Sequence, residues 1–229
     1  AFGVTATETF TYTMEDCIHA MSTASVTVSV TGINHAPVAA PVEASTAEDG
    51  ADVVIDVMAG VSDPDAGDSL TLSVDTSQTQ GSAWVNSAGQ VAYSAGSAFQ
   101  HLGAREFGSD TFDYTVTDSH GRQSTATAQV SVAGVNDAPV ALGDDISTNE
   151  DTPVLGNVLL NNGLGADSDI DGDAVSVSAV EGSALNVGTQ ITLAGSGALL
   201  TVNANGSYEY DPGGQFESLA VGQSTTDSF

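Results

Sequence analysis

The chain has 229 residues, a length that suits about two domains of ordinary size. Its 30 Asp and Glu residues face only two basic residues, Arg105 and Arg122, so the formal net charge is -28. Nucleic acid and anionic lipid surfaces are excluded as partners because they bind clusters of Lys and Arg, and cations are favoured instead. Val and Ala spaced by Thr and Ser predict an all-β protein.

Stabilisation and export are constrained by what the sequence lacks. Cys17 is the only cysteine, so no disulfide forms within the chain and another interaction must rigidify an extracellular protein. No apolar run reaches the length of a membrane span, and no basic-then-apolar leader is present. We therefore expect no direct membrane insertion and an export signal outside these residues.

An internal repeat organises the chain. The segment 32–39 (GINHAPVA) recurs as 134–141 (GVNDAPVA), a shift of 102 residues (134 − 32), and the same shift relates 8–12 to 110–114. This period is the size of one sandwich domain, and the proline of each Asn-x-Ala-Pro segment makes a short, extended connector. We expect tandem domains with the boundaries 1–35 (last strands of an upstream repeat plus linker), 36–134 (a complete repeat) and 135–229 (a repeat lacking its last strands).

The complete repeat carries short strand patterns separated by turns. The turns 86–90 and 203–207 read as hairpin loops in which Gly89 and Gly206 supply a positive φ. About seven antiparallel strands in an Ig-like sandwich are predicted, six of them from alternation: 52–57, 69–74, 82–86, 90–94, 111–117 and 124–132.

The two ends of the chain overlap in the repeat. Residues 220–229 align with residues 1–10, and residues 8–31 correspond to the two final strands of a repeat. Unpaired strand edges invite the addition of another strand. The overlap therefore predicts head-to-tail strand complementation between copies of the chain.

Acidic loops recur in the repeats and predict calcium sites at the domain junctions. Residues 63–68 read DPDAGD and residues 167–173 read DSDIDGD, in which alternate carboxylates can converge on one hard cation. The second loop matches the first half of an EF-hand loop, but Ser178 stands where the bidentate Glu belongs. The candidate calcium ligands are Asn34, Glu48, Asp63, Asp65, Asp68, Asp113, Asp118, Asn136, Asp137, Glu150, Asp167, Asp169, Asp171 and Asp173.

Other chemistries have weaker support. The four histidines lie in predicted loops without metal-ligand spacing, so they are predicted to be solvated surface residues and not zinc ligands. No nucleophile or nucleotide motif is present. Paired carboxylates could serve a glycosidase, but these recur in each repeat as structural sites do. The sequence predicts no enzyme. Trp84 is the only tryptophan, on the strand face opposite Ala83 and Val85, so a calcium-dependent carbohydrate-binding module is the alternative hypothesis.

Several segments of the sequence resemble VCBS and bacterial cadherin-like repeats. These segments are 134–140, 149–152, 167–173, 188–193, 203–208 and 227–229. Those repeats build the extender regions of large RTX adhesins that Gram-negative cells secrete by a type I system. The resemblance implies tandem Ig-like or cadherin-like β-sandwiches, one complete and two partial, with calcium at their junctions. His35 stands where the second connector has Asp137, so we expect the first junction to bind calcium more weakly.

The leading hypothesis is a non-catalytic, calcium-rigidified stalk of a surface adhesin. Such a stalk is secreted to the bacterial cell surface and projects a distal adhesive domain for attachment and biofilm. Its partners are the neighbouring repeats of the same polypeptide.

Overall fold

The computed structural model describes residues 3–229 and divides into two compact units, the first ending at Val135 and the second beginning at Asn136. Strands make up nearly all of the regular structure, so the fold is all-β, as the composition predicts. No helix in the described residues is long and apolar enough to cross a membrane. The boundaries at residues 35 and 134 stay predictions. The helical segments of residues 3–229 are short 3-10 turns: η1 (Val57–Gly60), η2 (Gly96–Ala98) and η3 (Ala184–Asn186).

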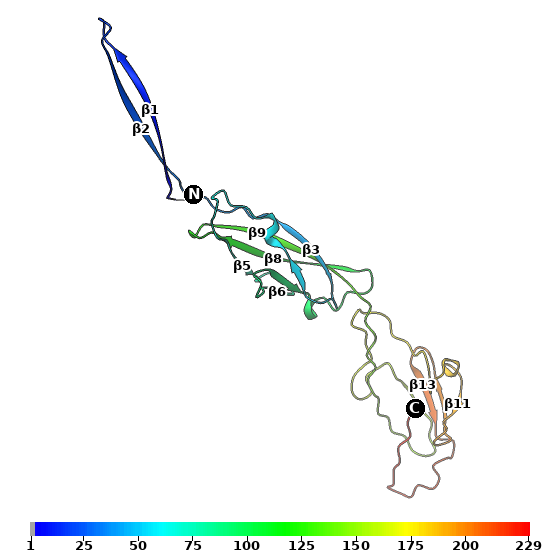
Figure 1. Cartoon of the computed structure of the whole chain (residues 1–229). Helices are drawn as coiled ribbons and strands as arrows, with labels where there is room; N and C mark the ends of the chain where they lie inside the picture. The colour runs from blue at the N-terminus through cyan, green and yellow to red at the C-terminus, as the bar shows by residue number, and fades with distance from the viewer. Residues whose placement is uncertain (1–2) are drawn as a thin grey trace. The chain divides into compact units, whose positions relative to one another are not determined.

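The first unit contains a long two-stranded hairpin, β1 (Thr5–Glu15) paired antiparallel with β2 (Met21–Thr31) (Figure 1). Successive side chains of a strand point to opposite faces. One face of the hairpin therefore carries threonine pairs, such as Thr9 Oγ1 at 3.0 Å from Thr27 Oγ1. The other face carries apolar side chains, which are Phe10, Tyr12, Met14, Val26, Val28 and Val30, and all of them are exposed.

A seven-stranded sandwich follows in the same unit. One sheet has the order β3-β9-β8-β5 and the other has the order β4-β7-β6. The seven strands are β3 (Val42–Ala47), β4 (Val53–Ile55), β5 (Thr71–Asp75), β6 (Ser82–Val85), β7 (Val91–Ser94), β8 (Phe107–Thr117) and β9 (Gln123–Ala133). The number of strands and the hairpin turn with Gly89 at φ 76° agree with the sequence prediction.

The prediction of a wholly antiparallel sandwich is wrong at one edge, because β3 pairs with β9 in parallel, with Val42 opposite Ala128. The strand order has a physical cause. The connector enters the sandwich beside the start of β9, where the Ala39 backbone N–H donates to Ser124 Oγ at 3.1 Å. Because β3 and β9 leave the same end of the sandwich, they run in the same direction.

The core of the sandwich lies between the inner faces of its two sheets. On β8, Phe112, Tyr114 and Val116 are fully buried, while Asp113 between them is exposed, as expected for a strand with one face in the core. The rings of Tyr93 and Phe112 stack with centroids 6.3 Å apart. Period-two alternation in the sequence therefore determines which face of each strand is buried.

A buried carboxylate links three elements of this core. Asp110 on β8 is 2% exposed and accepts hydrogen bonds from Tyr93 Oη (2.7 Å) and from the backbone N–H groups of Gln80 (3.0 Å), Gly81 (2.9 Å) and Thr111 (2.9 Å). Burial alone would raise the pKa of Asp110, but these four donors outweigh it and hold the pKa below its ordinary value. Burial, followed by the hydrogen bond to Asp110, raises the pKa of Tyr93.

The second unit contains one four-stranded sheet of order β10-β13-β12-β11. The order β10-β13-β12 repeats β4-β7-β6 of the sandwich, and Gly206 in the turn before β13 has φ 81°, as predicted. Its core is a cluster that includes Leu200, Val202 and Tyr208. The four strands are β10 (Val154–Asn157), β11 (Ile191–Thr192), β12 (Leu199–Val202) and β13 (Ser207–Asp211).

The carboxylate–tyrosine contact of the sandwich recurs in the second unit. Tyr210 Oη donates to Asp227 Oδ2 at 2.9 Å, and the Tyr210 ring stacks with Phe229 at 6.4 Å. A single shift of 117 residues relates Tyr93 to Tyr210 and Asp110 to Asp227 (210 − 93 and 227 − 110). Burial, followed by the hydrogen bond to Asp227, raises the pKa of Tyr210 to about 12.

We predict that Asp110→Ala lowers the free energy of unfolding of the first unit by about 2 to 4 kcal/mol at neutral pH, because it leaves buried donors without an acceptor. The folded state holds the pKa of Asp110 below its ordinary value, so its contribution is present above the unfolded pKa and is lost as pH falls through the folded pKa. Urea unfolding followed by circular dichroism at several pH values measures the difference, which should shrink in acid. Glu43→Gln, on the exposed side of β3, is the control; equal stabilities of Asp110→Ala and this control would contradict the prediction.

Candidate metal centre

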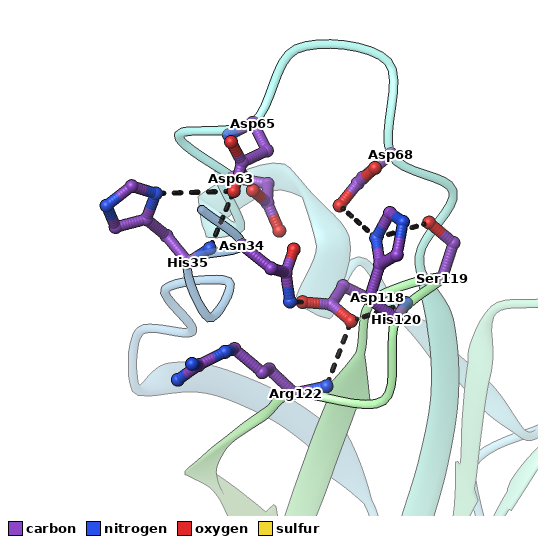
Figure 2. Close-up of polar contacts among 9 residues, drawn as sticks. All are labelled: Asn34, His35, Asp63, Asp65, Asp68, Asp118, Ser119, His120 and Arg122. Carbon is purple, nitrogen blue, oxygen red and sulfur yellow. Dashed lines mark hydrogen bonds and ion pairs between the residues drawn. The ribbon is translucent and has the colours of Figure 1, made fainter. Parts of the chain in front are cut away.

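The candidate centre lies at the end of the sandwich where the connector enters, and three segments form it. These are the connector at Asn34 and His35, the loop 62–68, and the turn between β8 and β9 (Figure 2). The turn is built by Asp118, whose Oδ1 accepts the backbone N–H groups of His120 at 2.8 Å and Arg122 at 2.9 Å. Local backbone hydrogen bonds therefore fix the Asp118 side chain.

The connector is attached to this end by two hydrogen bonds. Asn34 Nδ2 donates to Asp118 Oδ2 at 2.9 Å, and the His35 backbone N–H donates to Asp65 Oδ2 at 2.6 Å. Asp65 is in turn oriented within its loop, because its own N–H donates to Asp63 Oδ1 at 2.8 Å. Asn34, Asp65 and Asp118 are 7%, 6% and 4% exposed. The connector is thus part of the packed sandwich end.

Three carboxylates converge beside this attachment. One oxygen from each of Asp63, Asp68 and Asp118 lies within 4.8 Å of the others. Asp63 Oδ2 is buried and accepts no hydrogen bond, and the same is true of Asn34 Oδ1 beside the cluster (Figure 2). Like charges at this spacing repel, and a buried acceptor without a donor is costly. A hard cation bound by oxygen ligands would relieve both costs, so the residues fit such an ion.

The surroundings of the carboxylates favour their charged forms. The backbone N–H of His35 is the largest influence on Asp65 and holds the pKa of Asp65 below its ordinary value. Burial would raise the pKa of Asp118, but the donors Asn34, Arg122 and His120 lower it overall. Both side chains are therefore anionic at neutral pH, as cation ligands must be.

Two histidines border the cluster. The sequence analysis predicted that they are surface residues, but it did not predict their contacts with the acidic side chains. His35 Nδ1 lies 3.3 Å from Asp65 Oδ2, and His120 Nδ1 lies 3.2 Å from Asp68 Oδ2. Both imidazoles lie at the solvent-exposed rim of the cluster, so the oxygen atoms form its interior.

The second unit repeats this arrangement at its own connector. The Asp137 backbone N–H donates to Asp171 Oδ2 at 2.8 Å, and the Asp171 N–H donates to Asp169 Oδ1 at 2.9 Å. Val140 bridges Ser168 just as Val38 bridges Ser62 in the first unit. Asp169 and Asp171 are therefore the structural equivalents of Asp63 and Asp65.

Comparison with known families agrees with this geometry. The family model of the bacterial cadherin-like domain matches residues 34–134 and 136–229. The chain belongs to the bacterial cadherin-like domain family. Domains of this family are generally non-catalytic structural modules found outside the cell, and cadherin-like domains typically bind calcium.

Solved structures similar to this cadherin-like chain share little sequence with it. A nucleoside hydrolase-related hypothetical protein from Saccharophagus degradans is 22% identical over 44% of this chain and 26% of its own, with a TM-score of 0.30. Protocadherin gamma C5 EC1-3 is 17% identical over 85% of this chain and 63% of its own, with a TM-score of 0.39. Mouse PcdhgC3 EC1-3 is 18% identical over 90% and 66%, with a TM-score of 0.40. The chain thus spans less than two thirds of the length of the Saccharophagus degradans protein and of protocadherin gamma C5 EC1-3. A search of curated proteins gave no match.

The remaining predicted ligands occupy several environments. Glu48 is 3% exposed, its Oε1 accepts the Val135 N–H at 2.6 Å, and its Oε2 is buried with no hydrogen bond. In the second unit, Glu150 Oε2 and Asp171 Oδ1 are also buried without a hydrogen bond. Asn136 donates from Nδ2 to Asp137 O at 2.6 Å. These oxygens are available to a cation.

Three predicted ligands have other surroundings. Asp113 lies mid-strand on the exposed face of β8, where Thr127 Oγ1 donates to it at 2.6 Å, and the structure does not group it with Asp118. Asp167 Oδ1 accepts the Leu142 N–H at 2.8 Å and so shapes its loop. Asp173 is exposed beyond Gly172, which adopts φ 78°.

We predict that calcium titrated into the chain binds at the Asn34 centre, and that Asn34→Ala or Asp118→Asn weakens this binding by roughly tenfold or more, since ligand number and charge set calcium affinity. Isothermal titration calorimetry measures the affinity. Asp52→Asn removes an exposed carboxylate outside the cluster and should leave the titration unchanged. A titration of Asn34→Ala that superimposes on that of the unsubstituted chain would refute the assignment.

Proposed function

We propose that the chain is a calcium-rigidified, non-catalytic extender module. The observation that carries the proposal is the amide oxygen of Asn34, which is buried, accepts no hydrogen bond, and lies among converging carboxylates of the sandwich end. Asn34 belongs to the connector, so a cation held there would hold the connector against the sandwich.

The residues of this centre have separate roles in the proposed mechanism. Asp118 accepts a hydrogen bond from Asn34 Nδ2 and so holds the Asn34 amide, whose own oxygen would be a ligand of the ion, while Asp65 binds the backbone N–H of the next connector residue, His35. Asp63 and Asp68 supply further oxygens. Bound calcium supplies the positive charge that offsets the repulsion among these carboxylates.

The second connector has the residues for the same role. Asp171 binds the connector backbone at Asp137, as Asp65 does at His35, and Asp169 and Asn136 are in positions equivalent to Asp63 and Asn34. We propose that calcium also binds in the second unit with Asn136, Asp137, Glu150 and Asp171. Glu48 is a proposed calcium ligand within the first unit. Asp137 stands at the position that His35 occupies in the first connector, so the second connector is the stronger proposed calcium site.

The proposed setting is the outside of a bacterial cell. Extracellular placement is general to the family, whereas membership of a large RTX adhesin, export by a type I system and a role in biofilm are our proposals from the sequence resemblance. Neighbouring repeats of the same polypeptide are the proposed partners, together with a second copy of the chain through strand addition. The net charge of -28 supports cations as partners and disfavours nucleic acid.

Calcium removal tests the mechanical role. An ion bound only by the folded chain stabilises it by about 2.7 kcal/mol when free calcium is about a hundredfold above Kd. We therefore expect EGTA to lower the midpoint of thermal unfolding and to broaden the distance distribution from small-angle X-ray scattering. The Asn34→Ala, Asp169→Asn double variant should show the EGTA behaviour in calcium. If chelation changes neither quantity, the rigidifying role is wrong.

A carbohydrate-binding role is a second candidate, supported by Trp84. Its side chain is 38% exposed on β6, at the edge of the sheet β4-β7-β6. The neighbouring Val54 on the same face is 51% exposed, and Ala92 lies between them in the register. An exposed aromatic ring of this kind can stack on a sugar face.

A glycan array separates the two candidate functions. The extender role predicts no reproducible glycan binding in calcium, whereas the carbohydrate role predicts binding that Trp84→Ala abolishes and Val54→Ala leaves largely intact. Thermal unfolding of both variants serves as the control for folding. Glycan binding abolished by Trp84→Ala would replace the extender proposal with the carbohydrate-binding one.

A further inference from the structure

The chain enters and leaves the sandwich through two neighbouring strands. The connector leads into β3 at Val42, and the chain leaves β9 at Ala133. These strands are hydrogen-bonded neighbours that run parallel, with Val42 opposite Ala128 and Ala47 opposite Ala133. The points of entry and exit therefore lie at opposite ends of one strand pair.

This topology decides how tension along the chain acts on the sandwich. A pull on the connector draws β3 towards its N-terminal end, and a pull beyond Ala133 draws β9 towards its C-terminal end. In a parallel pair these directions are opposite, so the strands are sheared past each other and the hydrogen bonds of all six residue pairs are loaded together. Bonds that are loaded together share the force, whereas strands that are peeled from one end lose their bonds one after another.

The ladder is reinforced where the chain leaves it. The Glu48 backbone N–H donates to Ala133 O at 3.0 Å and so continues the ladder beyond β3. The side chain of Glu48 is 3% exposed, and its Oε1 accepts the Val135 N–H at 2.6 Å. The exit segment is therefore bound to the end of β3 by both the backbone and the side chain of one residue.

The connector is attached to the other end of the sandwich by separate contacts. Asn34 and His35 donate to the acidic cluster, and the Ala39 backbone N–H donates to Ser124 Oγ at 3.1 Å. These residues precede β3 in the chain, so tension reaches their contacts before it reaches the ladder. The connector should therefore detach first and release only a short length of chain.

We infer that the strand pair β3–β9 is a mechanical clamp, which makes the sandwich resist tension applied along the chain. The inference goes beyond the proposed extender role, from which it takes only that the chain is pulled. The clamp is made of hydrogen bonds between backbone atoms, so its resistance needs no ion. Calcium at the Asn34 centre would strengthen the earlier detachment of the connector.

Single-molecule force spectroscopy on the full chain tests the clamp through the choice of attachment points. Cys17 is exposed and is the only cysteine, so it serves as the first point, and Val135→Cys supplies the second. This arrangement shears β3 against β9. A peak of high force should accompany the release of the contour length of one sandwich, on the order of 300 Å.

A second arrangement peels the same two strands apart. It uses Asp49→Cys and Val135→Cys, with Cys17→Ser to remove the native attachment point. The new points lie at the end of the ladder where Ala47 is opposite Ala133, so the bonds break in succession from that end. The high-force peak should be lost and the sandwich should open at lower force. Thermal unfolding of both variants is the control for folding.

A pair of proline variants tests the ladder itself. Because Glu48 N–H bonds to β9, the alternation of a parallel ladder points the Ala44 N–H towards β9 and the Ser45 N–H to solvent. In the shear arrangement, Ala44→Pro removes a ladder bond and should raise the unfolding rate at constant force by about tenfold. Ser45→Pro, on the same edge strand, leaves the ladder bonds in place and is the matched control.

Equal peak forces in the two arrangements would overturn the inference, as would equal unfolding rates of Ala44→Pro and Ser45→Pro. If Ala44→Pro fails to fold, the comparison of attachment points still decides, because it leaves the ladder sequence unchanged. Pulling in EGTA should keep the clamp peak, and its loss there would assign the resistance to calcium and refute the clamp. A chain that binds calcium but opens at low force would refute the clamp alone and leave calcium rigidification intact.

Discussion

The backbone hydrogen bond from each connector to an Asp-x-Asp loop is the contact on which the junction chemistry depends. His35 N–H to Asp65 and Asp137 N–H to Asp171 are the same bond in two repeats. This bond brings the connector against a loop that is already acidic and, in the first unit, places the Asn34 amide beside Asp118. The carboxylates of Asp63, Asp68 and Asp118 then lie at a spacing at which like charges repel, and the proposed cation would offset this repulsion.

The core of the sandwich also contains a buried carboxylate, but protein donors, and not a proposed cation, satisfy it. Asp110 is satisfied by four protein donors and needs no ion, whereas Asp63 keeps a buried oxygen without a hydrogen bond. Acid should therefore weaken both the core and the sandwich end, because the pKa values of Asp110, Asp65 and Asp118 are all held below their ordinary values. Chelation, in contrast, should act only on the end where the proposed ion binds.

Much of the fold could be predicted because the repeat register and period-two alternation are local properties of the sequence. They identified β8, β9 and the hairpin β1–β2, and they placed glycine in the two hairpin turns. They did not identify β3, whose sequence VEASTA mixes small and polar residues, or its parallel pairing, which depends on where the connector enters.

The candidate site was predictable in residue type and only partly in detail. The acidic motifs predicted Asp63, Asp65, Asp169 and Asp171 as candidate ligands. That Asp169 and Asp171 correspond to Asp63 and Asp65 follows from backbone hydrogen bonds, which the sequence alone does not predict. The same applies to His35 and His120, which looked like ordinary surface residues. Asp113 was a candidate ligand like Asp118, but strand alternation places its side chain on the exposed face of β8.

Because basic residues are scarce, most of the acidic side chains have no positively charged side chain to pair with. The sequence has no lysine and only two arginines, Arg105 and Arg122, so few carboxylates can form an ion pair with a basic side chain of the same chain. Arg122 serves the centre with its backbone N–H to Asp118, and Asp68 faces the imidazole of His120. A lysine in these positions would neutralise the cluster permanently and remove its dependence on dissolved ions. If the cluster binds calcium as we propose, the order of the connector would instead depend on the concentration of free cation, which is the property expected of a calcium-stiffened extracellular module.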